Sequence, residues 1–156
     1  MRILVMSDSH GCSSVLYEAI ENEPTAAAVI FLGDGLRDAE EVALLYPDRR
    51  FYFVCGNCDP GAFNTPTVSE ERFGGVPFLL THGHLFGVKT GLGALKREAL
   101  RRGVQVVLYG HTHIPDVRCE DGLYLLNPGS IARKGTYGVV DIDAGRVTVG
   151  TRVLPS

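Results

Sequence analysis

The sequence predicts an α/β protein whose N-terminal half forms a parallel sheet with helical crossovers. Apolar runs typical of strands alternate with amphipathic segments typical of helices through the first 54 residues. Each of these apolar runs also ends in a short segment rich in glycine, aspartate or asparagine, and histidine joins the first of them. Open α/β sheets place their sites at the carboxyl ends of strands. The same observations therefore predict a fold and the edge at which its site lies.

The N-terminal elements follow in the order strand, helix, strand, helix, strand. The apolar runs that indicate strands are 2–6, 27–32 and 51–54. The first helix is expected to begin at a cap formed by Ser13 or Ser14, and the second to end near Pro47. The side chains expected to face inward are Val15, Leu16, Ala19 and Ile20 in the first helix, and Ala39, Val42 and Ala43 in the second. Right-handed crossovers would make these three strands parallel.

The C-terminal half has a different pattern. Residues 60–67 are expected to form a loop, followed by a hairpin of 68–73 and 76–80 around Gly74-Gly75. Thr90 is expected to cap a helix that buries Leu92, Leu95, Ala99 and Leu100. A buried strand is expected over 104–109. Turns at 120–122 and 144–145 then predict antiparallel strands up to the end of the chain.

Composition sets limits on the class of protein. The chain has 156 residues, 45% of them apolar and 21% charged, with a formal net charge of −3. We expect one domain over 1–156, no membrane span and no specific nucleic-acid partner. Because a strand begins at Arg2, we expect no signal peptide, a cytoplasmic location and four reduced cysteines. Composition leaves open whether the chain forms a homo-oligomer.

All five histidines lie in the short segments that follow apolar runs. The most informative is Gly110-His111-Thr112-His113, directly after the strand expected to end at Tyr109. Residues two apart share a face while strand geometry persists, so His111 and His113 are expected to point into one crevice. Ordinary surface histidines would be scattered over helices and turns as well. The clustering therefore favours the interpretation that these histidines are ligands over the interpretation that they are ordinary surface residues.

The other strand ends supply matching donors. The candidate ligands are Asp8, His10, Asp34, Asn57, His82, His111 and His113. A mixed set of oxygen and nitrogen donors suits Mn, Fe, Co, Ni or Zn better than Ca or Mg. Seven donors exceed what one tetrahedral ion needs but suit two ions about 3.5–4 Å apart, which can hold a bridging hydroxide and polarise a phosphoryl group.

These motifs resemble, in order, those of the calcineurin-like metallophosphoesterases. The matching segments are Asp8-Ser9-His10, Gly33-Asp34, Gly56-Asn57-Cys58-Asp59, His82-Gly83 and Gly110-His111-Thr112-His113. Asn127-Pro128-Gly129-Ser130 extends the resemblance to the small YfcE-like phosphodiesterases. The resemblance implies a four-layer αββα sandwich of two mixed β-sheets flanked by helices.

The resemblance also implies a ligand set and a reaction. Asp8, His10, Asp34 and His113 would hold one ion, and Asp34, Asn57, His82 and His111 the other. The cofactors would be two divalent transition-metal ions, with Mn²⁺ or Ni²⁺ favoured over Fe, Co or Zn. A hydroxide bridging them would attack a small phosphodiester, less readily a monoester. The residues expected at the reacting centre are Asp34, Asn57, Cys58 and His82. The alternative is a weakly active or inactive scaffold, like the retromer subunit of the same fold.

Cys58 is the departure from the wider family, in which many members have a histidine at this position. A thiol is a poor substitute for an imidazolium beside a phosphate. Cys55 and Cys58 form a C-x-x-C pair, but no second pair completes a zinc ribbon, and Pro60 and Gly61 disfavour the helix of a thioredoxin-like site. We expect Cys55 to be buried and Cys58 to face the site.

Several other residues have a weaker signal. Arg37, Lys89, Arg133 and Lys134 are candidates to neutralise a substrate phosphate, with Arg37 the best because it follows Asp34 closely. Asn127 is expected to fix a turn before Pro128. His84 is expected at the rim of the site or on the plain surface.

Overall fold

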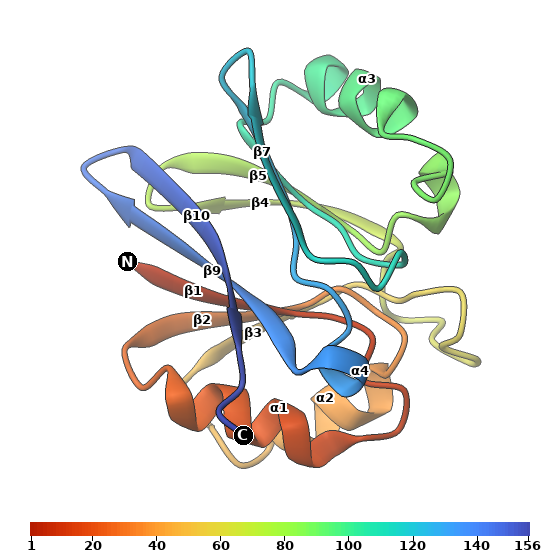
Figure 1. The fold of residues 1–156 in the computed structure, drawn as a ribbon, viewed down its shortest axis with the longest axis vertical. Coiled ribbons are helices and arrows are strands. Elements are labelled where there is room, and N and C mark those ends of the chain that lie inside the picture. Colours follow the sequence, from red (N-terminus) through yellow and green to blue (C-terminus); the bar gives the residue numbers. More distant parts are fainter.

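The computed structural model describes residues 1–156 and consists of two five-stranded sheets packed face to face between helices (Figure 1). The first sheet has the order β10 (Arg146–Val153), β9 (Thr136–Asp143), β1 (Arg2–Met6), β2 (Ala26–Phe31) and β3 (Arg50–Phe53). The second has the order β4 (Val68–Phe73), β5 (Val76–Thr81), β6 (Val106–Leu108), β8 (Leu123–Asn127) and β7 (Asp116–Glu120). The helices are α1 (Ser13–Asn22), α2 (Leu36–Ala43), α3 (Gly93–Arg102), α4 (Ile131–Lys134) and the 3₁₀ helix η1 (His84–Phe86).

Three apolar clusters fill the three interfaces between the four layers. Alternate residues of β1 enter different clusters: Ile3 and Val5 pack between the sheets, whereas Leu4 and Met6 pack beneath α1 and α2. The second sheet does the same, because Leu79 joins the cluster under α3 while its neighbours face the first sheet. A strand buried on both faces reads as a continuous apolar run. The expected four-layer αββα sandwich is confirmed.

The strand pairing agrees with the expected crossovers in the first half of the chain. β1, β2 and β3 pair in parallel, and β9 joins the other edge of β1 antiparallel. The hairpins β4–β5, β7–β8 and β9–β10 form as expected. The expectation of purely antiparallel strands after residue 113 is wrong for β8, which pairs parallel with β6 on its other side. Parallel pairing of β5, β6 and β8 makes the second sheet mixed as well.

The expected helix starts are wrong in two places. α1 begins at Ser13 behind Cys12, and neither Ser13 nor Ser14 caps it with a side-chain hydrogen bond. Thr90 lies in a turn before α3, where its hydroxyl donates to Gly87, and the helix itself begins at Gly93. Leu100 is 71% exposed instead of buried. α1 and α2 begin in loops of the candidate site, where backbone placement takes precedence over local capping.

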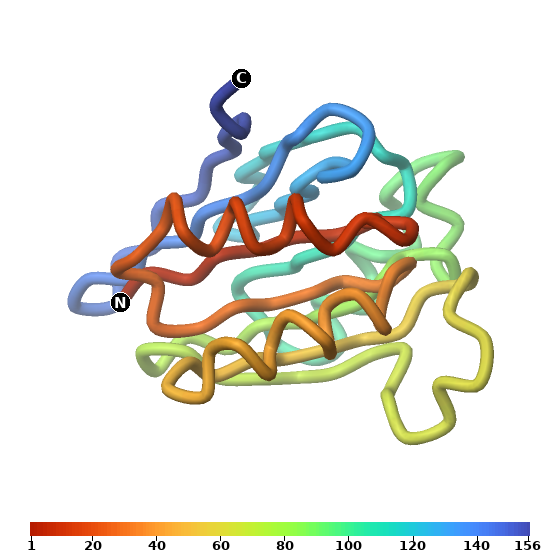
Figure 2. The backbone as a smooth tube through the Cα atoms, turned by 90° about the horizontal axis from the view of Figure 1, so that it is seen from below, coloured from red at the N-terminus to blue at the C-terminus, as the bar shows by residue number.

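Figure 2 shows α1 and α2 lying side by side over the first sheet, with the loop after β3 projecting at one side. α1, α2 and α4 cover the outer face of this sheet, and α3 covers the second sheet (Figure 1). No helix has the length and apolar character required to cross a membrane.

Candidate metal centre

The loops that follow β1, β2, β5 and β6 meet at one edge of the sandwich and are joined by backbone hydrogen bonds. The amide of Asp8 donates to the Gly33 carbonyl at 3.0 Å, and that of His10 to the Asp34 carbonyl at 3.1 Å. Within the second sheet, the Gly110 amide donates to the His82 carbonyl at 2.9 Å. Between the sheets, the His111 amide donates to Asp8 Oδ2 at 3.3 Å, and His82 Nδ1 lies 2.8 Å from the Leu32 carbonyl. Together these hydrogen bonds join the four strand ends.

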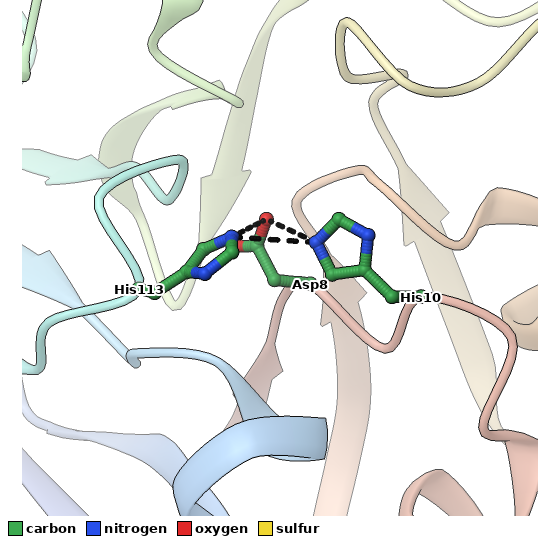
Figure 3. A group of neighbouring side chains, drawn as sticks. All are labelled: Asp8, His10 and His113. Atoms are coloured by element: carbon green, nitrogen blue, oxygen red, sulfur yellow. Dashed lines mark hydrogen bonds and ion pairs between the residues drawn. The ribbon is translucent and has the colours of Figure 1, made fainter.

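Asp8, His10 and His113 form the first group of candidate donors (Figure 3). Asp8 Oδ1 lies 3.3 Å from His113 Nε2 and 3.5 Å from His10 Nε2. The two imidazole Nε2 atoms are 3.3 Å apart. One carboxylate oxygen and two ring nitrogens therefore face a common point, with the carboxylate fully buried and the imidazoles partly exposed.

Asp34, His82 and His111 form the second group. His82 Nε2 lies 3.2 Å from Asp34 Oδ2 and 3.2 Å from His111 Nδ1. The other ring nitrogen of His82, Nδ1, is 2.8 Å from the Leu32 carbonyl, which can only accept a hydrogen bond. Nδ1 therefore carries the proton, and in the neutral ring Nε2 keeps its lone pair for a metal ion.

The two groups adjoin each other. Asp34 Oδ2, in the second group, is 4.0 Å from His10 Nε2 of the first. Asp8 Oδ1, in the first group, is 3.9 Å from His82 Nε2 of the second. Asp34 and Asp8 thus each face donors of both groups.

The electrostatics of the second group keep its carboxylate ionised. Burial works to raise the pKa of Asp34, but a protonated His82, whose Nε2 then donates to the carboxylate, and the Cys58 amide hold that pKa well below its usual range. A cation bound at Nε2 would replace that proton. Burial opposes protonation of His82, yet its hydrogen bond to Asp34 and the charge of Asp8 raise its pKa. Burial and the charge of His82 lower the pKa of His111. The site thus holds buried anions with imidazoles gathered around them.

The backbone of the site adopts left-handed conformations. Seven non-glycine residues in the chain have positive φ, and five of them are candidate ligands. Those five are Asp8 (58°), His10 (43°), Asp34 (58°), His111 (74°) and His113 (65°). Each such residue costs about 1–3 kcal/mol, and such strain concentrates at functional sites. This concentration marks the edge as a site independently of residue chemistry.

This backbone also changes how the histidine pair is placed. His111 and His113 were expected to share a face through strand alternation, but β6 ends at Leu108 and both residues are left-handed. His111 joins the second group and His113 the first. The two histidines therefore lie in adjoining groups, and strand alternation, the expected reason for their placement, is wrong.

Close packing at the strand ends requires glycine. A Cβ added at Gly56 would collide with Asp34 Oδ1, and one at Gly33 would collide with the backbone of Gly56. The ends of β2 and β3 can therefore approach closely only without side chains at these positions.

Asp59 organises the second and third strand ends, a role that motif reading alone missed. Its Oδ1 accepts the amides of Gly35 (2.8 Å) and Leu36 (3.0 Å). Its Oδ2 accepts those of Asp34 (2.8 Å) and Gly56 (2.7 Å). One carboxylate thereby fixes the Asp34 backbone and caps α2, whose own N-cap residue, Gly35, has no side chain.

Three more polar residues hold the first strand end. The Ser7 hydroxyl donates to Asp8 Oδ2 at 2.7 Å, and that of Ser130 donates to the Asp8 carbonyl at 2.8 Å. Asp38 Oδ2 accepts from the Ser9 hydroxyl and the Gly11 amide. The sequence signal for Asp38 is its place four residues after Asp34, on the first turn of α2.

Asn57 and Cys58 lie on the exposed loop after β3. Asn57 Nδ2 is 3.5 Å from Cys58 Sγ, and the Cys58 amide donates to Asp34 Oδ1 at 2.8 Å. Cys58 lines an open pocket of about 530 Å³ together with His10, Asp34 and Arg37. Cys58 therefore faces the site as expected.

Cys55 is buried, and its thiol donates to the Thr65 carbonyl at 3.3 Å. All four cysteines are free thiols. The two members of the C-x-x-C pair therefore have the separate positions expected from the sequence.

The weaker candidates fall in different places. Asn127 accepts the Gly129 amide and donates to Gly110 and Thr112, so it fixes both the expected turn and the histidine loop. The His84 ring lies 5.5 Å from that of His82, at the rim of the second group. Lys89 lines a second pocket, whereas Arg133 and Lys134 line neither of the two pockets.

Comparison with known proteins agrees with this geometry. Residues 1–145 match the model of the calcineurin-like phosphoesterase superfamily domain. The probable metallophosphoesterase YsnB of Bacillus subtilis is 31% identical over 96% of this chain and 89% of its own. Phosphodiesterase YfcE of Escherichia coli is 27% identical over 92% of this chain and 89% of its own.

A solved structure extends the agreement to three dimensions. The crystal structure of a predicted phosphoesterase from Streptococcus pneumoniae superimposes with a TM-score of 0.82 and 32% identity, covering 97% of this chain and 88% of that one. The fold, the order of the candidate ligands along the chain and the family match all indicate the same family. The chain belongs to the calcineurin-like phosphoesterase superfamily, among its small YfcE- and YsnB-like phosphoesterases.

Proposed function

We propose that the chain is a phosphodiesterase that works with two divalent transition-metal ions. The observation that carries the proposal is the pair of adjoining His/Asp groups with Asp34 facing both. The names of the similar proteins, a phosphodiesterase and a probable metallophosphoesterase, support the choice of reaction. A cytoplasmic location and a homo-oligomer stay predictions.

The donors present fit metal ions. Asp8 Oδ1 is buried and has no hydrogen-bond partner, although it points at two imidazole nitrogens. A buried carboxylate oxygen without a partner costs free energy, and a bound cation would remove that cost. Two pairs of imidazole nitrogens also lie close together, in His10 and His113 at 3.3 Å and in His82 and His111 at 3.2 Å. Protonated rings would repel each other at these distances, whereas neutral rings could share a bound cation.

We assign the ligands as the resemblance implies. Asp8, His10, Asp34 and His113 would hold one ion, and Asp34, Asn57, His82 and His111 the other. When bound, such ions supply Lewis acidity toward a phosphoryl oxygen and an activated water for attack at phosphorus. Histidine and carboxylate donors suit Mn, Fe, Co, Ni or Zn, and among these ions we propose Mn²⁺ or Ni²⁺.

The remaining side chains would position the substrate. Arg37 lines the same pocket as His10 and Asp34, so its guanidinium can pair with a phosphate oxygen held at the centre. Cys58 lines this pocket too, and we assign it the place beside the leaving group, where a proton donor would act. His82 keeps Asp34 ionised, and Asn57 would complete the second ligand set.

The first expected result is a metal content of two per chain. Protein stripped with a chelator, reloaded with Mn²⁺ and freed of excess metal should approach this ratio by elemental analysis. Loading should also raise the melting temperature, because the ions bind only the folded site. A content that saturates at one ion, with Asp34 contacting that ion alone, would disprove the paired site.

Turnover of bis(4-nitrophenyl) phosphate by the loaded protein tests the reaction itself. We expect hydrolysis of this diester to exceed that of 4-nitrophenyl phosphate, and to disappear on chelation. The alternative expected from the sequence, a scaffold of the same fold, predicts metal binding without turnover of either ester. Metal content and activity, measured on one preparation, therefore separate the two functions.

Cys58→His is expected to shift the preference between leaving groups. Nitrophenolate departs without a proton, whereas an alkoxide needs one in the transition state. A well-placed general acid contributes about 10²–10⁴-fold, and an imidazole at an unrefined position should restore roughly tenfold for an alkyl ester. Burial and the charge of Asp34 raise the pKa of the Cys58 thiol, while bound cations would lower it. With or without bound cations, the Cys58 side chain is therefore a poorer proton donor than an imidazolium.

The measurement is the ratio of turnover for 4-nitrophenyl and alkyl diesters, with metal content checked for each protein. Cys119→His, at another exposed cysteine, is the matched control. An unchanged ratio in Cys58→His, or complete inactivity of Cys58→Ala, would show that Cys58 is not the position of a missing acid.

A further inference from the structure

A second pocket, separate from the one that holds Cys58 and Arg37, lies beside the second donor group. Its volume is about 620 Å³, and it shares no lining residue with the first pocket. Tyr109 and Thr112, which flank Gly110-His111, form part of its wall. The segment after η1 contributes four residues, among them Lys89 and Leu92, and the rest come from Ile114 and from the start of β7. The pocket thus opens next to one half of the proposed reacting centre.

The wall of this pocket combines apolar and charged parts. Val88, Leu92 and Ile114 supply aliphatic surface, with Ile114 61% exposed. Such surface is suited to the carbon skeleton of a ligand, since burying it releases water. Because apolar surface alone does not identify a class of ligand, the charged residues of the pocket determine which ligand fits.

The charges of the pocket are unequally paired. Asp116 Oδ2 accepts hydrogen bonds from the Tyr109 hydroxyl at 3.1 Å and from Arg118 Nε at 2.8 Å. Arg118 also lies 3.9 Å from Glu120, so its charge is compensated within the chain. Lys89 has no carboxylate within 4.0 Å. Of the two cationic side chains that line this pocket, Lys89 is therefore the one whose charge is not compensated by a carboxylate.

Lys89 and the histidine loop share this pocket. Lys89 lines it together with Thr112, which lies between the proposed ligands His111 and His113. An arm of a substrate held at the metal centre that enters this pocket therefore meets the flexible Lys89 side chain.

We infer that this pocket receives one ester arm of the phosphodiester, an arm with an apolar body and an anionic end that pairs with Lys89. The inference rests on the proposed function and adds the substrate class to it. The phosphorus would lie at the donor groups, with the leaving group toward Cys58 and the retained arm toward Lys89. A carboxylate and a terminal phosphate share the chemistry that Lys89 recognises.

Two diesters with the same leaving group test this assignment. In 4-nitrophenyl phenyl phosphate the second arm is neutral, and in 4-nitrophenyl 4-carboxyphenyl phosphate it ends in a carboxylate. We expect the Mn²⁺-loaded wild type to have the lower KM for the carboxylated ester. Lys89→Ala should raise that KM about fivefold, the effect of one partly exposed ionic contact, with kcat and the neutral ester little changed.

Two further variants sharpen the experiment. Lys89→Arg should retain the preference, since it keeps the charge. Lys134→Ala, which removes an exposed lysine outside both pockets, is the matched control and should leave both KM values unchanged. Added salt should weaken the wild-type preference, because ions screen exposed charges. Binding is measured separately by competitive inhibition with 4-carboxyphenyl phosphate, or with 1,4-phenylene bisphosphate for the phosphate-ended arm.

Each other outcome counts against a stated claim. Equal KM values for the two esters in the wild type, or an equal loss for both in Lys89→Ala, would overturn the pocket assignment and leave the phosphodiesterase standing. An equal loss would place Lys89 on the scissile phosphate instead. A loaded wild type that cleaves neither ester would overturn the proposed function, and this inference with it.

Discussion

Asp34→Asn is expected to abolish most of the activity by removing the carboxylate that faces both donor groups. Asp34 Oδ2 lies 3.2 Å from His82 Nε2 and 4.0 Å from His10 Nε2, so an amide nitrogen there would meet both ligand sets. Replacing outer partners of metal ligands already costs about 10–100-fold, so loss of a bridging ligand should cost at least about 10²-fold in kcat. Metal content should fall below two per chain.

The fold should tolerate this change. An asparagine keeps Oδ1, the oxygen that accepts the Cys58 amide at 2.8 Å. Asp48→Asn, the same chemical change at an exposed loop position, is the matched control. His84→Ala should lose much less activity, because His84 has no assigned ligand role. Equal losses in Asp34→Asn and His84→Ala, with both variants folded, would show that the bridge is misassigned or that His84 is undervalued.

The parts of the fold that could be predicted depend on burial patterns. Runs such as residues 2–6 and 27–32 identify strands because both of their faces are buried, and the two-residue period then decides which side chain enters which apolar cluster. Helix starts could not be predicted, because the chain enters α1 from a loop fixed by the site and not by a local serine cap. The parallel pairing of β8 with β6 depends on tertiary packing, which a local turn signal does not indicate.

The candidate site could be assembled from the sequence because metal chemistry restricts residue type and topology brings the strand ends together. The division of His111 and His113 between two groups could not be predicted, since it follows from left-handed backbone at both residues. Asp59 was visible as part of a motif, but its function was not. Four backbone amides from two segments converge on it, and backbone donors leave no signature in a sequence.

Asp59→Asn is therefore the prediction that tests the structure most directly. The carboxylate accepts four amide hydrogens from Asp34, Gly35, Leu36 and Gly56 at 2.7–3.0 Å. An asparagine amide group offers one oxygen and one NH₂, and the NH₂ would face two amide donors instead of accepting from them. The Asp34 backbone and the start of α2 would lose their common support.

The expected result is a loss of metal affinity and activity of about 10–100-fold, the range found for residues that orient metal ligands. Because hydrogen bonds to a charged group contribute about 1.5–3 kcal/mol, some loss of stability should accompany it. Saturating Mn²⁺ should restore part of kcat, since the ligands themselves remain. A residue that supports only the fold would lower the melting temperature without this metal-dependent recovery.

Two controls separate positioning from folding. Asp143→Asn makes the same change on exposed β-sheet surface and should alter neither metal affinity nor turnover. Asp59→Glu keeps the charge and should recover more of the metal affinity than Asp59→Asn, because a carboxylate can still accept from all four amides after a small shift of the loop. If Asp59→Asn binds two ions with wild-type affinity and turns over normally, the Asp34 loop does not need this carboxylate. The hydrogen bond from the Cys58 amide to Asp34 Oδ1 would then be what holds the two strand ends together.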